Sequence, residues 1–96
     1  MQVKVEFGGG AERLFDNQKT IELTLDQSRS WTLKHLICHL RDRHLKESPE
    51  LFVSGDSVRP GILVLVNNTD WELLGDKDYE LNNRDEILFM STLHGG

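Results

Sequence analysis

The stretch WTLKHLICHLRDRHL, residues 31–45, is the only part of the chain with the spacing of an amphipathic helix. Its apolar residues recur at intervals of three and four, which places them on one buried stripe: Leu33, Leu36, Ile37 and Leu40. Ser30 or Thr32 can cap its N-terminus, and Pro49 stops it from continuing far beyond Lys46. Because one helix covers only one face of a sheet, the other apolar segments should form a single sheet whose second face meets solvent.

Two alternating strands precede this helix. Their inward residues alternate with polar ones: Val3, Val5 and Phe7 in the first strand, and Ile21, Leu23 and Leu25 in the second. Glycines 8–10 end the first strand, and Leu14 and Phe15 in the following loop should fold back onto the core. The two strands are therefore predicted to form a hairpin with a long connection.

Shorter segments follow the helix. Residues 62–66, ILVLV, are apolar on both faces, so this strand should lie well inside the sheet. The elements predicted after it are a turn at 67–70, a short fourth strand at 71–75 (WELLG), an irregular segment or single helical turn at 76–81, a turn at 82–85 and a final strand that begins at Glu86.

This order of elements indicates an α+β fold. Strand, strand, helix, strand, short strand and strand can form a curled mixed sheet of about five strands, with the first and last strands parallel neighbours at its centre. That arrangement, with one main helix packed on one face, is the β-grasp or ubiquitin-like fold. We expect residues 1–91 to form this domain and residues 92–96 to form a flexible tail that ends in Gly-Gly.

The outer face of the predicted sheet carries apolar residues. If Ile87 and Phe89 face the helix, Leu88 and Met90 face outward. One apolar set from residues 62–66 should lie beside them, either Leu63 with Leu65 or Ile62 with Val64 and Val66. Such a patch on a small domain often marks a partner site, and the alternative is that loops cover these residues.

The composition narrows the classes of partner. The net charge is −5, with 16 acidic residues against 11 basic ones, which disfavours direct binding to nucleic acid and favours docking on basic protein surfaces. The apolar run 62–66 is too short to span a membrane, and the alternating residues 1–7 are typical of a strand rather than a signal peptide. The single cysteine, Cys38, allows no internal disulfide. We expect a monomer in the cytoplasm that can also enter the nucleus.

No motif in the chain indicates catalysis. His35 and His39 stand four residues apart on the helix beside Cys38 and could share a metal. No HExxH pattern or fourth ligand accompanies them, so a solvated polar face is the favoured interpretation. His44 is placed on the core side near the helix C-terminus, where it can cap carbonyl groups. We expect no catalytic residues, no metal and no bound cofactor.

The chain ends in STLHGG, residues 91–96. Five residues from Thr92 to Gly96 reach about 17 Å beyond the sheet when extended, at roughly 3.3–3.6 Å each. Residues without a Cβ are suited to a narrow channel in another protein. The reactive group would then be the terminal carboxylate of Gly96.

Three stretches together resemble a known family. GDSVRPGILVLVN (residues 55–67), DWELLG (residues 70–75) and STLHGG are similar to the eukaryotic ubiquitin-related modifier, a sulfur carrier among the ubiquitin-like proteins. The resemblance implies that an E1-like activating enzyme uses ATP to adenylate the C-terminal carboxylate, and that a persulfide sulfur on that enzyme then converts it to a thiocarboxylate. It also implies sulfur delivery to wobble uridine of cytosolic tRNAs through a thiouridylase complex, and conjugation to lysines of target proteins.

The resemblance assigns roles to the tail residues. Gly96 carries the sulfur or the isopeptide linkage, Gly95 supplies a slim neck, and Leu93 and His94 position the tail in the partner's groove. Leu88 and Met90 are the candidate residues for docking on the activating enzyme.

Two alternatives remain at this point. The chain could be a non-covalent ubiquitin-like adaptor that binds through its sheet face and has an inert tail. A weaker alternative is a metal-binding protein that uses His35 and His39.

Overall fold

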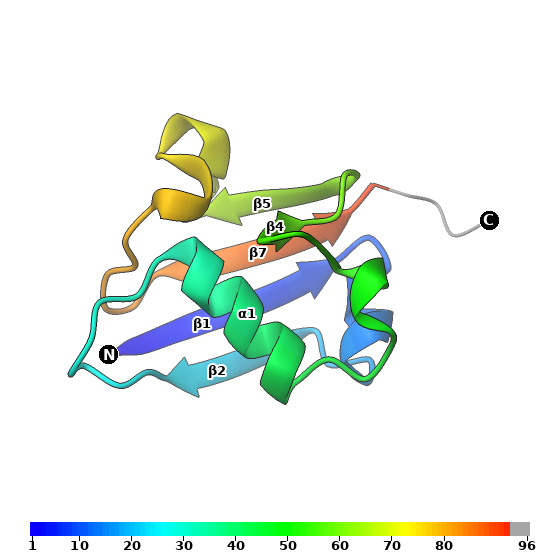
Figure 1. The fold of residues 1–96 in the computed structure, drawn as a ribbon, viewed down its shortest axis with the longest axis horizontal. Coiled ribbons are helices and arrows are strands. Elements are labelled where there is room, and N and C mark those ends of the chain that lie inside the picture. Colours follow the sequence, from blue (N-terminus) through cyan, green and yellow to red (C-terminus); the bar gives the residue numbers. More distant parts are fainter. Residues whose placement is uncertain (93–96) are drawn as a thin grey trace.

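The computed structural model describes residues 1–92 of the 96-residue chain. Its elements, in chain order, are β1 (Gln2–Gly8), the 3-10 helix η1 (Ala11–Phe15), β2 (Thr20–Thr24), α1 (Leu33–Arg43), η2 (Pro49–Leu51), β3 (Val53–Ser54), β4 (Ser57–Val58), β5 (Ile62–Val66), β6 (Thr69–Asp70), η3 (Trp71–Leu73), η4 (Asp76–Asp78) and β7 (Glu86–Ser91). The helix α1 lies across one face of the main sheet (Figure 1). No helix in residues 1–92 has both the length and the apolar character needed to cross a bilayer.

The main sheet has five strands in the order β2-β1-β7-β5-β6. β1 pairs with β7 in parallel, with Val5 opposite Ile87 and Phe7 opposite Phe89, and the two arrows point the same way in Figure 1. β2 and β5 flank this pair in antiparallel register. The predicted β-grasp fold, with its first and last strands parallel at the centre, is confirmed.

Aromatic rings fill the core between α1 and the sheet. The ring of Phe15 stacks on Phe7 at a centroid distance of 4.2 Å and meets the edge of Phe52 at 5.0 Å. Phe52 in turn lies 5.4 Å from Phe89 of β7. Phe15 and Phe52 come from outside the main sheet, so the loop after β1 does fold back onto the core as predicted. Its other apolar residue, Leu14, is partly buried against the same cluster.

The helix begins at a reciprocal cap. The hydroxyl of Thr32 accepts a hydrogen bond from the backbone N–H of His35, and Nδ1 of His35 accepts one from the backbone N–H of Thr32. This is a capping box in which histidine takes the place of the usual Glu or Gln. Thr32, rather than Ser30, is therefore the N-cap. α1 ends at Arg43, and its four predicted core residues are all buried.

The short elements after β5 differ from the sequence prediction. Residues 71–75 are not a fourth strand, because Trp71 turns into the core and the N–H of Leu74 closes a 3-10 turn by donating to the carbonyl of Trp71. The carboxylate of Asp70 caps that turn by accepting from the N–H of Glu72 at 3.0 Å. The strand beside β5 is instead Thr69–Asp70, which lies inside the predicted turn at 67–70.

Three other local features complete the comparison with the sequence prediction. Asn67 and Asn68 both have positive φ, at 50° and 69°, as a two-residue hairpin between β5 and β6 requires. The small β3–β4 hairpin was not predicted, because its strands are only two residues long and their pattern is too short to recognise. The single helical turn predicted within 76–81 is present as η4.

Candidate functional site

The outer face of the sheet carries a compact apolar patch. In the β5–β7 register, Leu63 lies opposite Met90 and Leu65 lies opposite Leu88. All four side chains are half-buried. The alternate residues of the two strands are buried beneath α1: Ile62, Val64, Val66, Ile87 and Phe89. The two possible orientations of residues 62–66 are thereby resolved, with Leu63 and Leu65 facing outward. We call Leu63, Leu65, Leu88 and Met90 the outer apolar patch.

The outer apolar patch meets the neighbouring strand β1 at a glycine, which has no side chain. Gly8 of β1 pairs with Met90, and a Cβ atom built on Gly8 would lie 3.6 Å from the terminal methyl of Met90 and 3.9 Å from a methyl of Leu88. Contact is therefore close without steric conflict. The patch is continuous across β5 and β7 and reaches the edge of β1.

Acidic residues border the outer apolar patch at one end. Glu6 pairs with Leu88 in the β1–β7 register, and Glu86 precedes the patch on β7. Both carboxylate side chains line one open hollow together with Leu65 and Leu88. An apolar centre beside two carboxylates is complementary to a partner surface that presents an apolar group flanked by Lys or Arg.

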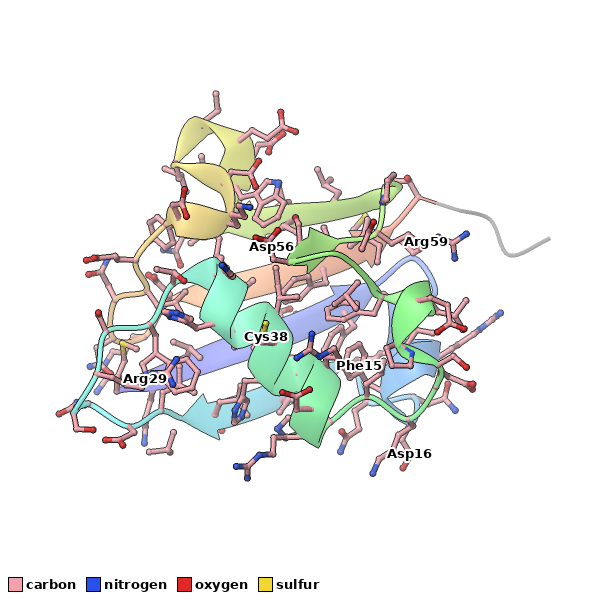
Figure 2. The ribbon with its side chains drawn as sticks, viewed as in Figure 1. Phe15, Asp16, Arg29, Cys38, Asp56 and Arg59 are labelled. Atoms are coloured by element: carbon pink, nitrogen blue, oxygen red, sulfur yellow. The ribbon has the colours of Figure 1, made fainter. Side chains whose placement is uncertain are left out.

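The tail begins at the end of β7 that lies away from this acidic border. Ser91 is the last residue of β7, and Thr92 extends the pairing with β5 by donating to the carbonyl of Gly61. The four residues predicted to thread into a partner, Leu93, His94, Gly95 and Gly96, lie outside the described residues. Their roles stay predictions. Arg59 lies at this same end of the sheet (Figure 2) and lines one hollow with Ser91.

The histidines of α1 have defined partners. His35 is engaged in the N-cap, and His39 packs against the ring of Trp31 at a centroid distance of 5.6 Å and against His44 at 5.5 Å. Both His35 and His39 are half-buried, so the predicted polar face of α1 is only partly solvated. The ring of Trp31 meets both histidines edge-on, and its indole N–H donates to the carbonyl of Asp26 at 2.8 Å.

This cluster is not built as a metal site. Within residues 1–92, no group of three or more His, Cys, Asp or Glu side chains is arranged to hold a metal ion. Cys38 is half-buried in the middle of α1 (Figure 2). His44 is the C-cap residue as its position suggested, but it is the backbone N–H, bonded to the carbonyl of Leu40, that closes the helix end.

Burial lowers the pKa of His39, and the nearby charges of His44 and Arg43 lower it further. The pKa of His44 is lowered first by burial and then by Lys46 and Arg43. Both rings therefore favour the neutral form in the folded protein. A stacked guanidinium adds positive charge to the same region, since Arg29 lies 4.3 Å over the ring of Trp31.

The sequence analysis missed the turn that meets the tail. The stretch Arg59-Pro60-Gly61-Ile62 has proline at its second position and glycine at its third, which is the signature of a type II turn. The structure has the expected hydrogen bond from the N–H of Ile62 to the carbonyl of Arg59, at 3.1 Å, and a φ of 99° at Gly61. The Pro-Gly pair was the available signal.

Comparisons with known proteins agree with this architecture. Residues 2–96 match the family described as Urm1 (Ubiquitin related modifier). The chain is 58% identical to ubiquitin-related modifier 1 of Bos taurus, covering 100% of this chain and 96% of that one, and 59% identical to that of Mus musculus, covering 98% and 94%. The solution structure of Urm1 from Trypanosoma brucei superimposes with a TM-score of 0.84 at 42% identity, covering 99% of this chain and 95% of that one. The chain therefore belongs to the ubiquitin-related modifier family.

Proposed function

We propose that this chain is a sulfur carrier and protein modifier that acts through the carboxylate of Gly96. The observation that carries the proposal is the family match, which runs through the last residue of a chain whose central strand β7 ends at Ser91. The coarser statement, a ubiquitin-like modifier with the β-grasp fold, is already established by that match and by the fold. The chemistry of the tail is the proposed part.

Activation would proceed in three balanced steps. The carboxylate of Gly96 attacks the α-phosphorus of ATP on an E1-like enzyme and expels pyrophosphate, which leaves an acyl-adenylate. A persulfide sulfur of that enzyme attacks the acyl carbon and expels AMP, which leaves an acyl disulfide. A thiol then reduces the S–S bond and releases the carrier with a C-terminal thiocarboxylate.

The loaded carrier would have two outlets. Through a separate thiouridylase complex, its sulfur would supply the 2-thio group of wobble uridine in cytosolic tRNAs. The activated tail could instead acylate lysines of target proteins. Because the net charge of the chain is −5, the tRNA would be bound by the partner complex and not by the carrier. This proposal places the carrier in the cytoplasm, with entry into the nucleus.

The domain itself would serve as the surface that the activating enzyme grips. Met90 of the outer apolar patch stands two residues before Thr92, a separation of about 7 Å along a strand. A partner that covers the patch is therefore within reach of the tail, because four further residues span about 13–14 Å at most. Leu88 and Met90, with Leu63 and Leu65 beside them, are the residues proposed to dock.

Intact-mass spectrometry of the protein purified from its native cell tests the proposed function. We expect a fraction in which one oxygen is replaced by one sulfur, and we expect deletion of Gly96 to abolish that fraction. Only the plain carboxylate, in cells that contain the activating enzyme and the sulfur donor, would contradict the sulfur-carrier role.

The outer apolar patch also favours a second candidate, the non-covalent adaptor. An adaptor predicts that deletion of Gly96 has no effect on partner binding or on sulfur-modified tRNA. It also predicts that Leu88→Asp abolishes binding while the intact mass stays that of the plain carboxylate. The two candidates therefore give opposite results for the Gly96 deletion.

A further inference from the structure

The end of β7 is held between two glycine turns, one on each neighbouring strand. Gly9 follows β1 and lies against Ser91, and Gly61 precedes β5 and meets Thr92. These turns belong to the two strands that flank β7 in the sheet. The last described residues of the chain are therefore fixed from both sides, immediately before the tail.

The carbonyl of Gly61 accepts two hydrogen bonds from one residue. The backbone N–H of Thr92 donates to it at 2.7 Å, and the hydroxyl of Thr92 donates to it at 2.6 Å. A carbonyl oxygen has two lone pairs, so both bonds can form at once. The first bond adds one rung to the β5–β7 ladder beyond the pair Ile62–Ser91. The second bond requires a hydroxyl on the Cβ of residue 92, which only Ser or Thr provides.

The turn that presents this carbonyl is rigid for local reasons. Pro60 fixes its own φ, and Gly61 has a φ of 99°, a value that residues with a side chain rarely adopt. The turn is closed by the hydrogen bond from Ile62 to Arg59 and tied to the β3 region by the bond from the N–H of Arg59 to the carbonyl of Phe52 at 2.8 Å. The acceptor of both Thr92 bonds is thus held in place by the fold.

Gly9 packs closely against the other side of the same strand end. Its φ is 65°, and a Cβ atom built there would overlap the carbonyl oxygen of Ser91. Gly10, the next residue, has a φ of 101°, yet a Cβ built on it would meet nothing within 4 Å. Both glycines therefore have a positive φ, and they differ in their contact with β7.

We propose that Thr92 is a positioning residue for activation of the C-terminus. Its paired bonds to Gly61 hold residue 92 in place before any partner binds, so that the activating enzyme does not have to order this residue itself. This inference rests on the proposed function. A tail anchored at residue 92 has a reach of about 13–14 Å instead of the roughly 17 Å of a tail free from residue 92. The entropy of ordering residue 92 is then no longer lost on binding, so the effect falls on KM.

Steady-state adenylation with the activating enzyme, measured as ATP-dependent pyrophosphate release at varied carrier concentration, tests the role of the hydroxyl. Thr92→Val removes the hydroxyl and keeps the shape of the side chain, whereas Thr92→Ser keeps the hydroxyl. We expect Thr92→Val to raise KM about 3- to 10-fold with kcat unchanged within about twofold. Thr92→Ser should keep both constants near those of the unsubstituted protein. Hydrogen exchange at the backbone amide of residue 92 in the free protein, corrected for the intrinsic rate of each residue type, should be faster in the Thr92→Val variant than in the Thr92→Ser variant.

A second pair of variants tests the restraint without touching Thr92. Gly9→Ala forces Ser91 aside and should raise KM, while Gly10→Ala carries the same kind of backbone strain and should not. Thermal unfolding of both variants separates the loss of fold stability, which they share, from the effect on the tail.

The possible results divide cleanly. If the activating enzyme releases no pyrophosphate from ATP in the presence of the unsubstituted carrier, the proposed function itself fails. If it does, and Thr92→Val has an unchanged KM, loses only kcat, or behaves like Thr92→Ser, Thr92 is not a positioning residue. Equal KM values for the Gly9→Ala and Gly10→Ala variants would also overturn the inference.

Discussion

Leu88 of β7 stands directly opposite Leu65 of β5, and both side chains lie on the sheet face away from α1. The buried neighbours of Leu88 on its own strand, Ile87 and Phe89, point to the other face and are fully enclosed. Leu88 can therefore be changed without opening the core. Substitutions in the outer apolar patch can therefore test partner binding without disturbing the core.

Leu88→Asp should weaken binding to the activating enzyme by at least about tenfold, because a charge placed at the centre of an apolar contact must be desolvated without a partner. Calorimetric titration of the folded variant against the enzyme measures the effect. Thr24→Asp is the matched control, since Thr24 is an exposed outward residue of β2 on the same sheet. Similar binding by both variants would remove the outer apolar patch from the docking surface.

Asp85→Ala should lower the free energy of unfolding by about 2–4 kcal/mol, because it removes the acceptor of several hydrogen bonds at once. Its carboxylate, on a residue only 5% exposed, accepts from the hydroxyl of Tyr79 at 2.8 Å, the side-chain amide of Asn67 at 2.9 Å and the backbone N–H of Asn82 at 2.8 Å. Urea unfolding measures the change. Tyr79→Phe removes one of these donors and should cost only about 1 kcal/mol. Equal losses in the two variants would show that the network does not depend on the carboxylate.

Thr32→Ala should destabilise the protein by about 1 kcal/mol, because it removes the side-chain acceptor of the helix N-cap. Ser30→Ala is the control, since the hydroxyl that bonds to the N–H of His35 belongs to Thr32. Thermal unfolding monitored by circular dichroism compares them. A larger loss for Ser30→Ala would contradict the assignment of the cap.

Stability should fall as the pH is lowered through the titration of His39 and His44. Burial, reinforced by nearby positive charges, holds the pKa of each ring below the ordinary value of 6.5 in the folded state. The unfolded chain therefore takes up protons first as the pH drops, so this contribution is fully present above pH 6.5 and is lost progressively below it. Asp42 opposes the shift at His39 but does not reverse it.

Urea midpoints measured at about pH 7.5 and about pH 5.5 test this expectation. The difference between the two midpoints should shrink in the double variant His39→Gln/His44→Gln, which cannot titrate at either position. An unchanged difference would mean that other groups govern the acid side of the stability profile.

Much of the fold could be predicted because the burial pattern is periodic within each element. The stripe from Leu33 to Leu40 and the alternation from Val3 to Phe7 each report a local geometry that needs no knowledge of the neighbours. The β-grasp arrangement follows once a single helix must share one core with all the strands. Trp71 marks the limit of this reasoning, since its short apolar segment was predicted as a strand but is drawn into a 3-10 turn by burial of the indole and the cap from Asp70.

The candidate site was only partly predictable. The outward direction of Leu88 and Met90 followed from the inward direction of Ile87 and Phe89, because side chains alternate along a strand. Leu63 and Leu65 could not be chosen over Ile62, Val64 and Val66, because every residue of that strand is apolar. The choice depends on which face α1 covers, which is a relationship between distant segments.

By itself, the sequence determined the repeating burial of each element, the β-grasp order of those elements, the Gly-Gly end and the likeness to the ubiquitin-related modifier family. Only the tertiary structure decided which face of β5 is open, how Asp85 gathers three donors, and that Thr92 shares the carbonyl of Gly61. The physical reason is the sequence separation over which each kind of interaction acts. Periodicity and turn chemistry act between residues a few positions apart, whereas Thr92 and Gly61 are separated by 31 positions and meet only because β5 and β7 pair.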